Sequence, residues 1–318
     1  MERNKKLWIV GIIVVAILII IGVSSNKGPK ETGPIKIGFV APLTGDVAGI
    51  GQNMKAATEL AISEINKNGG INGRLITLIA EDGKCDGKEA VTAVTKLINI
   101  DKVPVIIGGA CSSETVAPAP IAEKAKVVML SPLSSNPSIT TAGDYIFRNY
   151  ASDSFQGVKA AEFAVNTLKS KNIAVLSCMS DWCQGLQQEF KNKAVSLGAK
   201  IAVEEKYDDK NTNDLKTQLA KIKAANPDLV YFVGYTDGTI IGLKQAKELG
   251  LNVKFLGGDA WNDPKIITNA GAASEGIIYL VPTSVKNPVF EVSFLGVVGG
   301  KEITIGSREA YDLSLIHI

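Results

Sequence analysis

The chain has 318 residues, of which 46% are apolar and 21% charged, and such a chain folds around a sizeable core, most often in about two domains. Its 34 basic and 32 acidic residues nearly balance, so no strong positive field is expected to attract nucleic acid. The single histidine, His317, excludes histidine-based catalytic triads and zinc sites. The four cysteines contain no CxxC pair, which excludes a zinc ribbon or a dithiol redox site, and we expect neither a metal nor a cofactor.

The amino terminus has the pattern of an export signal. Three basic residues precede the charge-free apolar run of residues 7–23 and a polar stretch follows it, so the rest of the chain is expected outside the cytoplasm. Two fates stay open: cleavage after Ser25, or a retained membrane anchor, which the length of the run favours; a buried core helix is a third interpretation. No cysteine occurs before Cys85, which excludes a lipoprotein anchor. Residues 1–23 are therefore predicted to form a signal or anchor helix, and residues 24–34 a flexible linker.

From Ile35 onward, short β-branched runs alternate with amphipathic stretches, as in βαβ units with parallel sheets. The first series predicts four strands separated by three helices. The strands are expected at 35–42, 75–80, 103–109 and 127–132, and the helices at 52–67, 87–99 and 113–125.

A second series begins with a helix over 153–169, with Asp153 or Ser154 as its N-cap. Further strands, separated by helical segments, are expected at 172–177, 199–205, 228–234, 253–258 and 276–281. Two successive series of parallel strands predict an α/β fold with two Rossmann-like, doubly wound lobes.

Ligands of such sheets bind beyond the carboxyl ends of the strands, so the residues at those ends are the candidates for a site. They supply hydroxyls, backbone amides, two aromatic rings and one acid. The candidate ligand-binding residues are Cys111, Ser112, Leu133, Ser134, Ser135, Trp182, Tyr235 and Asp259.

This set of groups suits a small zwitterion. A carboxylate is held by hydroxyls and free N–H groups where a helix begins, as at Ser112. An ammonium group needs an acceptor with negative charge, which Asp259 supplies once water is excluded. The rings of Trp182 and Tyr235 can enclose a side chain. No nucleophile is paired with a general base, so binding is favoured over catalysis and the protein is predicted not to be an enzyme.

Each candidate also has a purely structural interpretation. Ser112 and Ser135 are ordinary helix caps, Asp259 is a plausible turn residue, and the two aromatics can belong to the core. The GIG at 49–51 is only half of a dinucleotide fingerprint, which argues against a nicotinamide cofactor.

From Ile35 to about Asp312 the chain resembles the branched-chain amino-acid-binding proteins of ABC importers, which have the type I periplasmic-binding-protein fold. The matching stretches include IKIGFVAPLTGDVAGIG, AISEINKNGGINGRLITLIAEDGKCD, CSSET, LSPLSSNPSIT, FRNYASDSFQG and FLGGDAWNDP. The Asn-Gly-Gly-Ile-Asn-Gly-Arg turn at 68–74 and the ordered strand-end serines make this combination specific.

The resemblance implies a role for each strand-end residue. Ser112 and Ser135 correspond to the hydroxyl residues that hold the α-carboxylate of the amino acid, and the backbone around Leu133 and Ser135 to the segment that meets its α-ammonium. Asp259 corresponds to the acidic partner of the ammonium, and Tyr235 to a tyrosine of the pocket wall.

Three positions depart from the family pattern. Ile50 replaces a residue that is often aromatic, Trp182 stands where a smaller aromatic usually stacks on the ligand, and Asp259 is one methylene shorter than the usual glutamate. These differences leave the preferred side chain of the ligand open.

The cysteines form two candidate pairs. Cys85 follows the second strand and Cys111 the third, strands expected to be neighbours, and the resemblance implies a disulfide between them. For Cys178 and Cys183 both a disulfide and free thiols stay open. Disulfides agree with an oxidising, extracytoplasmic location.

We expect two lobes joined by a hinge, which close on a ligand between them. Residues 35–152 plus 283–318 are expected to form one lobe and residues 153–282 the other. The protein is expected to close on an amino acid, most plausibly branched-chain or otherwise apolar, and to deliver it to the permease of an ABC importer. The alternatives are another small polar ligand such as an amide or urea, a sensory ectodomain and, last, an enzyme. In the resembled family more chain follows Asp312, and the final SLIHI does not resemble the helix expected there, so the first lobe is expected to be truncated.

Overall fold

The structure, a computed structural model, describes residues 33–283, 287–300 and 303–316. The described residues from Ile35 onward form one compact unit. The predicted signal or anchor helix at 1–23, and the predicted linker apart from Gly33 and Pro34, lie outside the described residues. Within the part that the structure describes, no helix has the length and apolarity needed to cross a membrane.

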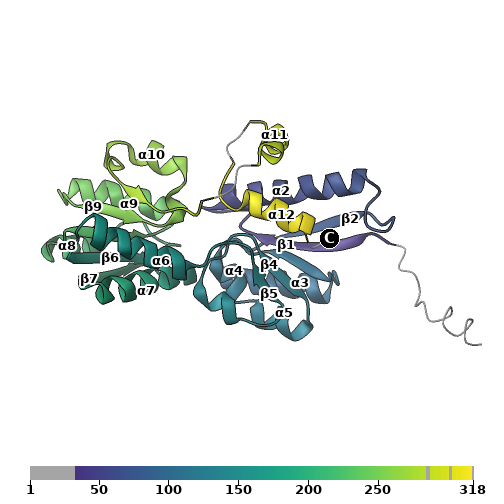
Figure 1. Ribbon diagram of the computed structural model, residues 1–318, viewed down its shortest axis with the longest axis horizontal. Helices are drawn as coiled ribbons and strands as arrows, with labels where there is room; N and C mark the ends of the chain where they lie inside the picture. Colours follow the sequence, from purple (N-terminus) through teal and green to yellow (C-terminus); the bar gives the residue numbers. More distant parts are fainter. Residues whose placement is uncertain (1–32, 284–286, 301–302, 317–318) are drawn as a thin grey trace, which may run out of the picture. The chain divides into compact units, whose positions relative to one another are not determined.

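The first half of the Ile35–Ile318 unit is built on a five-stranded parallel sheet with the order β2-β1-β3-β4-β5 (Figure 1). The strands are β1 (Ile35–Ala41), β2 (Ile76–Asp82), β3 (Val105–Gly108), β4 (Val128–Ser131) and β5 (Ile146–Arg148). The helices between them are α2 (Ala48–Lys67), α3 (Gly87–Asn99), α4 (Ser112–Val116) and α5 (Ala119–Ala125).

The second half has its own five-stranded parallel sheet, with the order β10-β9-β8-β6-β7. Its strands are β6 (Asn172–Cys178), β7 (Lys200–Tyr207), β8 (Leu229–Val233), β9 (Lys254–Gly257) and β10 (Ile278–Tyr279). Its helices are α6 (Asp153–Glu162), α7 (Asp181–Ser196), α8 (Lys216–Ala224), α9 (Thr236–Glu248) and α10 (Pro264–Ala270).

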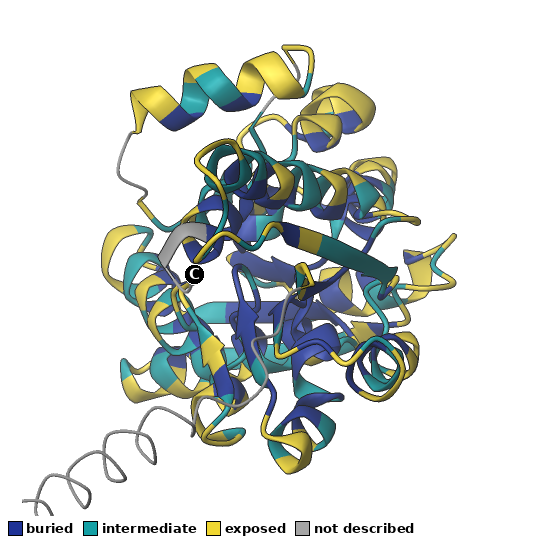
Figure 2. Ribbon diagram, turned by 90° about the vertical axis from the view of Figure 1, so that its right-hand side faces the viewer, coloured by how far each residue is buried: buried dark blue, intermediate teal, exposed yellow. Residues whose placement is uncertain are grey.

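Central strands covered by helices on both faces must be apolar throughout, and the sequence meets this requirement. All five residues of β8, Leu-Val-Tyr-Phe-Val, are buried, and the last five residues of β1 are buried as well. Figure 2 shows the buried strands at the centre and the exposed faces of the helices outside them. The sheets are therefore rigid supports for the loops at their carboxyl ends.

The chain passes from the first half to the second between β5 and α6 and returns after β10. The returning segment forms α11 (Pro288–Val297) and α12 (Ser307–Ile316), which pack on α2 of the first half (Figure 1). The hydroxyl of Tyr311 in α12 donates a hydrogen bond to Glu64 Oε2 in α2 at 2.5 Å. The first half therefore includes residues of the returning segment as well as residues from the start of the unit.

Several predicted elements differ from those observed. The expected helix at 113–125 is divided into α4 and α5, because Pro118 has no N–H to continue the first helix. The three-residue strand β5 was not predicted, since so short a run carries no periodicity. Helix α2 begins at Ala48 rather than at residue 52. A side chain at position 51 would overlap the carbonyl oxygen of Pro42, so Gly51 permits the close approach of α2 to the end of β1.

Three further expectations are corrected. The N-cap of α6 is Ser152, whose hydroxyl accepts from the N–H of Ser154 at 3.3 Å, so Asp153 is the first helical residue. Strands β2 and β3 are not neighbours, because β1 lies between them. Helix α12 continues to Ile316, which places most of the final SLIHI segment in the helix.

Candidate functional site

A small cavity of about 50 Å³, partly open to solvent, is bordered by residues of both halves. Seven of the eight predicted ligand-binding residues line it: Cys111, Ser112, Leu133, Ser135, Trp182, Tyr235 and Asp259. The remaining lining residues are Pro42, Val47, Ile50, Ala110, Ala260 and Ile305.

The sheet topology explains why these residues meet. Each predicted residue follows the carboxyl end of a parallel strand, in the first half after β3 and β4 and in the second half after β6, β8 and β9. In parallel α/β sheets these ends lie at one edge, where ligands bind. The cavity thus has one wall from each sheet.

Ser112 ties together two loops of the first wall. Its hydroxyl oxygen accepts from the backbone N–H of Ser135 at 3.3 Å and from that of Asn136 at 3.1 Å. Because the oxygen serves as the acceptor in both bonds, the hydroxyl proton is left to donate to another group. This wall therefore presents a hydroxyl donor to the cavity.

Ser134, the eighth predicted residue, does not line the cavity. Its buried hydroxyl lies within hydrogen-bond distance of the carbonyl oxygens of Gly109 and Cys111, at 3.0 and 2.9 Å, and of the hydroxyl of Thr115 at 2.7 Å. Ser134 holds the loop after β3 in place, and its contacts are all to the protein.

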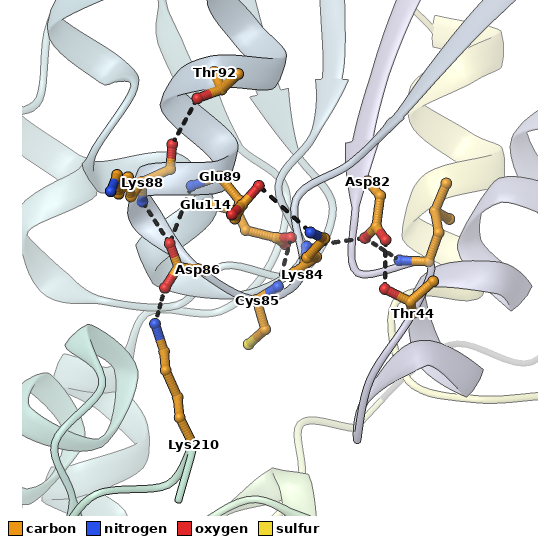
Figure 3. A network of polar contacts seen from close by, with 11 residues as sticks. Thr44, Asp82, Lys84, Cys85, Asp86, Lys88, Glu89, Thr92, Glu114 and Lys210 are labelled. Carbon is orange, nitrogen blue, oxygen red and sulfur yellow. Dashed lines mark hydrogen bonds and ion pairs between the residues drawn. The ribbon is translucent and has the colours of Figure 1, made fainter.

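Glu114 is a buried residue that the sequence analysis did not single out. Its Oε2 accepts from the N–H groups of Ala110 and Cys111, both at 3.0 Å, and its Oε1 from the N–H of Cys85 at 3.0 Å; Figure 3 shows the contact with Cys85. Burial, opposed by these three donors, raises the pKa of Glu114 to about 7. The Cys-Ser-Ser-Glu spacing of a capping box was the available signal. A side chain at Gly109 would overlap Glu114, so the loop needs glycine there.

Among the described residues that line the cavity, Asp259 is the single acid, and it is buried. Its Oδ2 accepts from the hydroxyl of Tyr150 at 2.8 Å. Burial raises the pKa of Asp259, while the bonds from Tyr150 and Gln156 lower it. Tyr150 lies in the segment between β5 and α6 and was not predicted as a site residue; nothing local in the sequence pairs it with Asp259.

The two predicted aromatics pack against each other. The rings of Trp182 and Tyr235 lie 4.9 Å apart between centroids, at 33°. With Val47, Ile50 and Leu133 they give the cavity an apolar lining. Among the described residues that line it, none is lysine or arginine, so an anionic group there would depend on hydroxyl and N–H donors.

Polar contacts join the two halves around the cavity. The N–H of Asp237 donates to Asp46 Oδ2 at 3.3 Å, and Asn136 Nδ2 donates to the carbonyl oxygen of Asp181 at 2.6 Å. Asp86 forms an ion pair with Lys210, drawn in Figure 3. The structure is therefore a conformation in which the halves touch on more than one side of the site.

Both predicted cysteine pairs are disulfides in the structure, Cys85–Cys111 and Cys178–Cys183. The first links the loops after β2 and β3, and Cys111 itself lines the cavity. Across the described residues, no group of three His, Cys, Asp or Glu side chains is arranged to hold a metal ion.

Comparisons with known proteins agree with this architecture. Residues 34–288 match the family model described as periplasmic binding protein. The leucine-, isoleucine-, valine-, threonine-, and alanine-binding protein of Pseudomonas aeruginosa is 36% identical over 270 residues, which are 84% of this chain and 71% of that protein. The solved structure of a leucine-binding protein from Thermotoga maritima has a TM-score of 0.78 at 30% identity and covers 87% of this chain and 80% of its own. A branched-chain amino acid transporter substrate-binding protein from Streptococcus pneumoniae, solved with isoleucine, has a TM-score of 0.78 at 27% identity, covering 88% and 82%.

Proposed function

The chain belongs to the periplasmic binding proteins, a family of non-enzymatic solute-binding proteins, and we propose that it captures an apolar amino acid, foremost a branched-chain one, for an ABC importer. The observation that carries the proposal is the shared cavity, with a hydroxyl donor on one wall and a buried acid on the other. The relatives named for leucine, isoleucine and valine support the choice of ligand.

In this proposal the two walls hold opposite ends of the ligand. Ser112 and the segment around Ser135 hold the α-carboxylate, and Asp259 holds the α-ammonium as a charge-assisted hydrogen bond. The side chain of the amino acid lies against Ile50 and Trp182. Since Trp182 is larger than the usual aromatic, we expect this protein to prefer a smaller or differently shaped side chain than its relatives do.

The halves act as lobes of a clamp, residues 35–152 with 283–318 and residues 153–282, which move about the crossings near 151–152 and 282–283. Carboxylate binding to the first lobe comes first, and closure then brings Asp259, Trp182 and Tyr235 to the ligand. Excluding water strengthens the charge pairs. A micromolar affinity, about 8 kcal/mol, is enough for a scavenging receptor. The closed protein then docks on its permease at the outer face of the membrane.

Calorimetric titration with single α-amino acids, acetamide and urea tests the proposal. We expect leucine, isoleucine or valine to bind, and Asp259→Ala to abolish the binding. Asp144→Ala, at an exposed turn of the first half, is the control and should leave the affinity unchanged. Binding of urea or an amide that survives Asp259→Ala would favour the neutral-ligand alternative, and the absence of binding by every α-amino acid would remove the proposal.

A further inference from the structure

A second buried carboxylate lies behind the wall of the cavity. Asp153, the first residue of α6, is 1% exposed. Neither of its carboxylate oxygens has a hydrogen-bond partner of normal geometry among the described residues. A buried ionised carboxylate without partners is strongly unfavourable, so this side chain requires an explanation.

Asp153 is in contact with both walls. Its backbone N–H donates to the carbonyl oxygen of Ser135 at 2.8 Å. The side chains of Ser135 and Trp182 are the polar neighbours that favour its charged form, and both line the cavity. Asp153 therefore lies one side chain away from the space that the ligand would occupy.

The charges around Asp153 do not neutralise it. Burial is the main cause that raises the pKa of Asp153, and the charge of Asp259 raises it further. The charge of Arg148 lowers this pKa, but by less than Asp259 raises it. The guanidinium of Arg148 is engaged with the carbonyl oxygens of Ser135 and Asn136, at 3.0 and 2.6 Å, and with the hydroxyl of Thr140.

The other titratable groups that face the two acids are phenols. Burial raises the pKa of Tyr150 and Tyr231 above the ordinary value, with the acids Asp153 and Asp259 as further causes, and burial does the same for Tyr235, with Asp153 among its smaller causes. These phenols stay neutral at physiological pH and supply no positive charge. Two neighbouring buried carboxyls with so little positive charge cannot both ionise at low cost.

We propose that Asp153 and Asp259 form a carboxyl pair that holds one proton until the ammonium group of the ligand enters, and that the pair then releases this proton to solvent. The inference rests on the proposed function. The exchange balances, because the R–NH₃⁺ group replaces H⁺ beside two carboxylates and no covalent bond to the ligand forms. Asp153 thereby becomes a second residue that selects for a cationic amino group, since a neutral amide leaves the proton in place.

The competing interpretation is that Asp153 only stabilises the amino terminus of α6 as an acid in its first turn. The chain contains a matched position. Asp181 is the first residue of α7 and follows the N-cap Ser180, as Asp153 follows the N-cap Ser152, but Asp181 is exposed. Asp181→Asn is therefore the control for Asp153→Asn.

The test is calorimetric titration of leucine at pH 7 in phosphate and in Tris, whose ionisation enthalpies differ. We expect the observed enthalpy to differ between the buffers by the equivalent of up to about one released proton. Asp153→Asn should remove this difference and Asp181→Asn should retain it. Equal enthalpies in the two buffers for the unaltered protein, or a full proton release that persists in Asp153→Asn, would overturn the proposal.

A ligand-free measurement separates this proposal from the proposed function. A carboxyl whose pKa is raised on folding adds stability below its unfolded pKa, and this stability is lost as pH rises through the folded pKa. We expect the Tm of the ligand-free protein to fall more steeply than that of Asp153→Asn as pH rises above the ordinary carboxyl pKa of about 4. If Asp153→Asn does not fold, Asp259→Asn serves, because the pair needs both carboxyls. Parallel Tm curves would contradict the pair. Failure of every amino acid to bind, with Tm curves that still differ, would contradict the proposed function and leave the shared proton of the pair in place.

Discussion

The hydroxyl of Tyr150 donates to Asp259 Oδ2 at 2.8 Å and so joins the segment where the chain crosses between the halves to the acid of the cavity wall. The two residues are 109 positions apart in sequence. The bond favours the ionised form of Asp259, which is the form that an ammonium group needs.

Tyr150→Phe should weaken leucine binding at pH 7 by on the order of tenfold or more, because a hydrogen bond to a charged group contributes about 1.5–3 kcal/mol. Without the Tyr150 donor, the pKa of Asp259 rises further and less carboxylate is present. The defect should therefore shrink as the pH is raised towards 9. Tyr145→Phe, a nearby tyrosine whose hydroxyl makes no contact with Asp259, is the control, and equal affinities of the two variants at pH 7 would count against this role.

Glu114→Gln should lower stability, because the amide places an N–H₂ group against one of three backbone N–H donors. The cost is about 1–3 kcal/mol. Burial raises the pKa of Glu114 from the ordinary glutamate value to about 7 in the folded protein, so the stability that protonation adds is lost as pH rises through about 7. In thermal melts, the difference in Tm between the unaltered protein and Glu114→Gln should become smaller from pH 5 to pH 8. A Tm difference that becomes larger over this range would contradict the argument.

Asp46 should make closure depend weakly on pH. Asp46 is exposed as a residue, but partial burial of its carboxylate, followed by the charge of Asp237, raises the pKa of Asp46 to about 6. The Asp237 N–H and Lys265 act in the opposite direction. A proton on Asp46 thus favours the joined halves, and this contribution is lost as pH rises through about 6.

We expect the leucine affinity of the unaltered protein, relative to that of Asp46→Asn, to increase a few-fold, on the order expected for a partly exposed charge, as pH falls from 7 to 5. This ratio does not depend on the proton that the Asp153–Asp259 pair releases, because that release takes place in both proteins. Asp46→Asn is the reference because its amide keeps an acceptor for the Asp237 N–H and has no charge to titrate. Asp144→Asn should behave like the unaltered protein, and an Asp46→Asn profile identical to it would refute the assignment.

The Cys85–Cys111 disulfide spans 26 positions and Cys178–Cys183 only 5. In the chain-entropy model, closing the longer loop contributes about 3 kcal/mol and the shorter about 2 kcal/mol. Denaturant unfolding of the two double Cys→Ser variants should show the larger loss for Cys85 and Cys111. A larger loss for the shorter bridge would show that chain entropy does not govern these two sites.

Sequence reasoning located the cavity because parallel strands place their carboxyl ends at one edge, so residues after each strand could be listed before their distances were known. Ser112 and Asp259 were found in this way. Ser134 was listed by the same rule but faces the protein interior, since strand-end position does not determine the direction of a side chain.

Two groups were beyond the reach of local patterns, and a third had only a partial signal. Tyr150 and Asp153 act through partners distant in sequence, and their burial depends on how the second half folds over them. Glu114 had a local signal, the capping-box spacing, but its three donors come from two separate loops. The strand β5 was missed because its three residues gain their conformation from pairing with β4.

The most direct measurement compares leucine with two molecules that each lack one charge, 4-methylpentanoate without the ammonium and 3-methylbutylamine without the carboxylate. If opposite walls hold opposite ends of the ligand, calorimetry should show leucine binding with about micromolar affinity and each of the other two at least about 100-fold more weakly. Binding of either one-charge molecule as tightly as leucine would contradict the account.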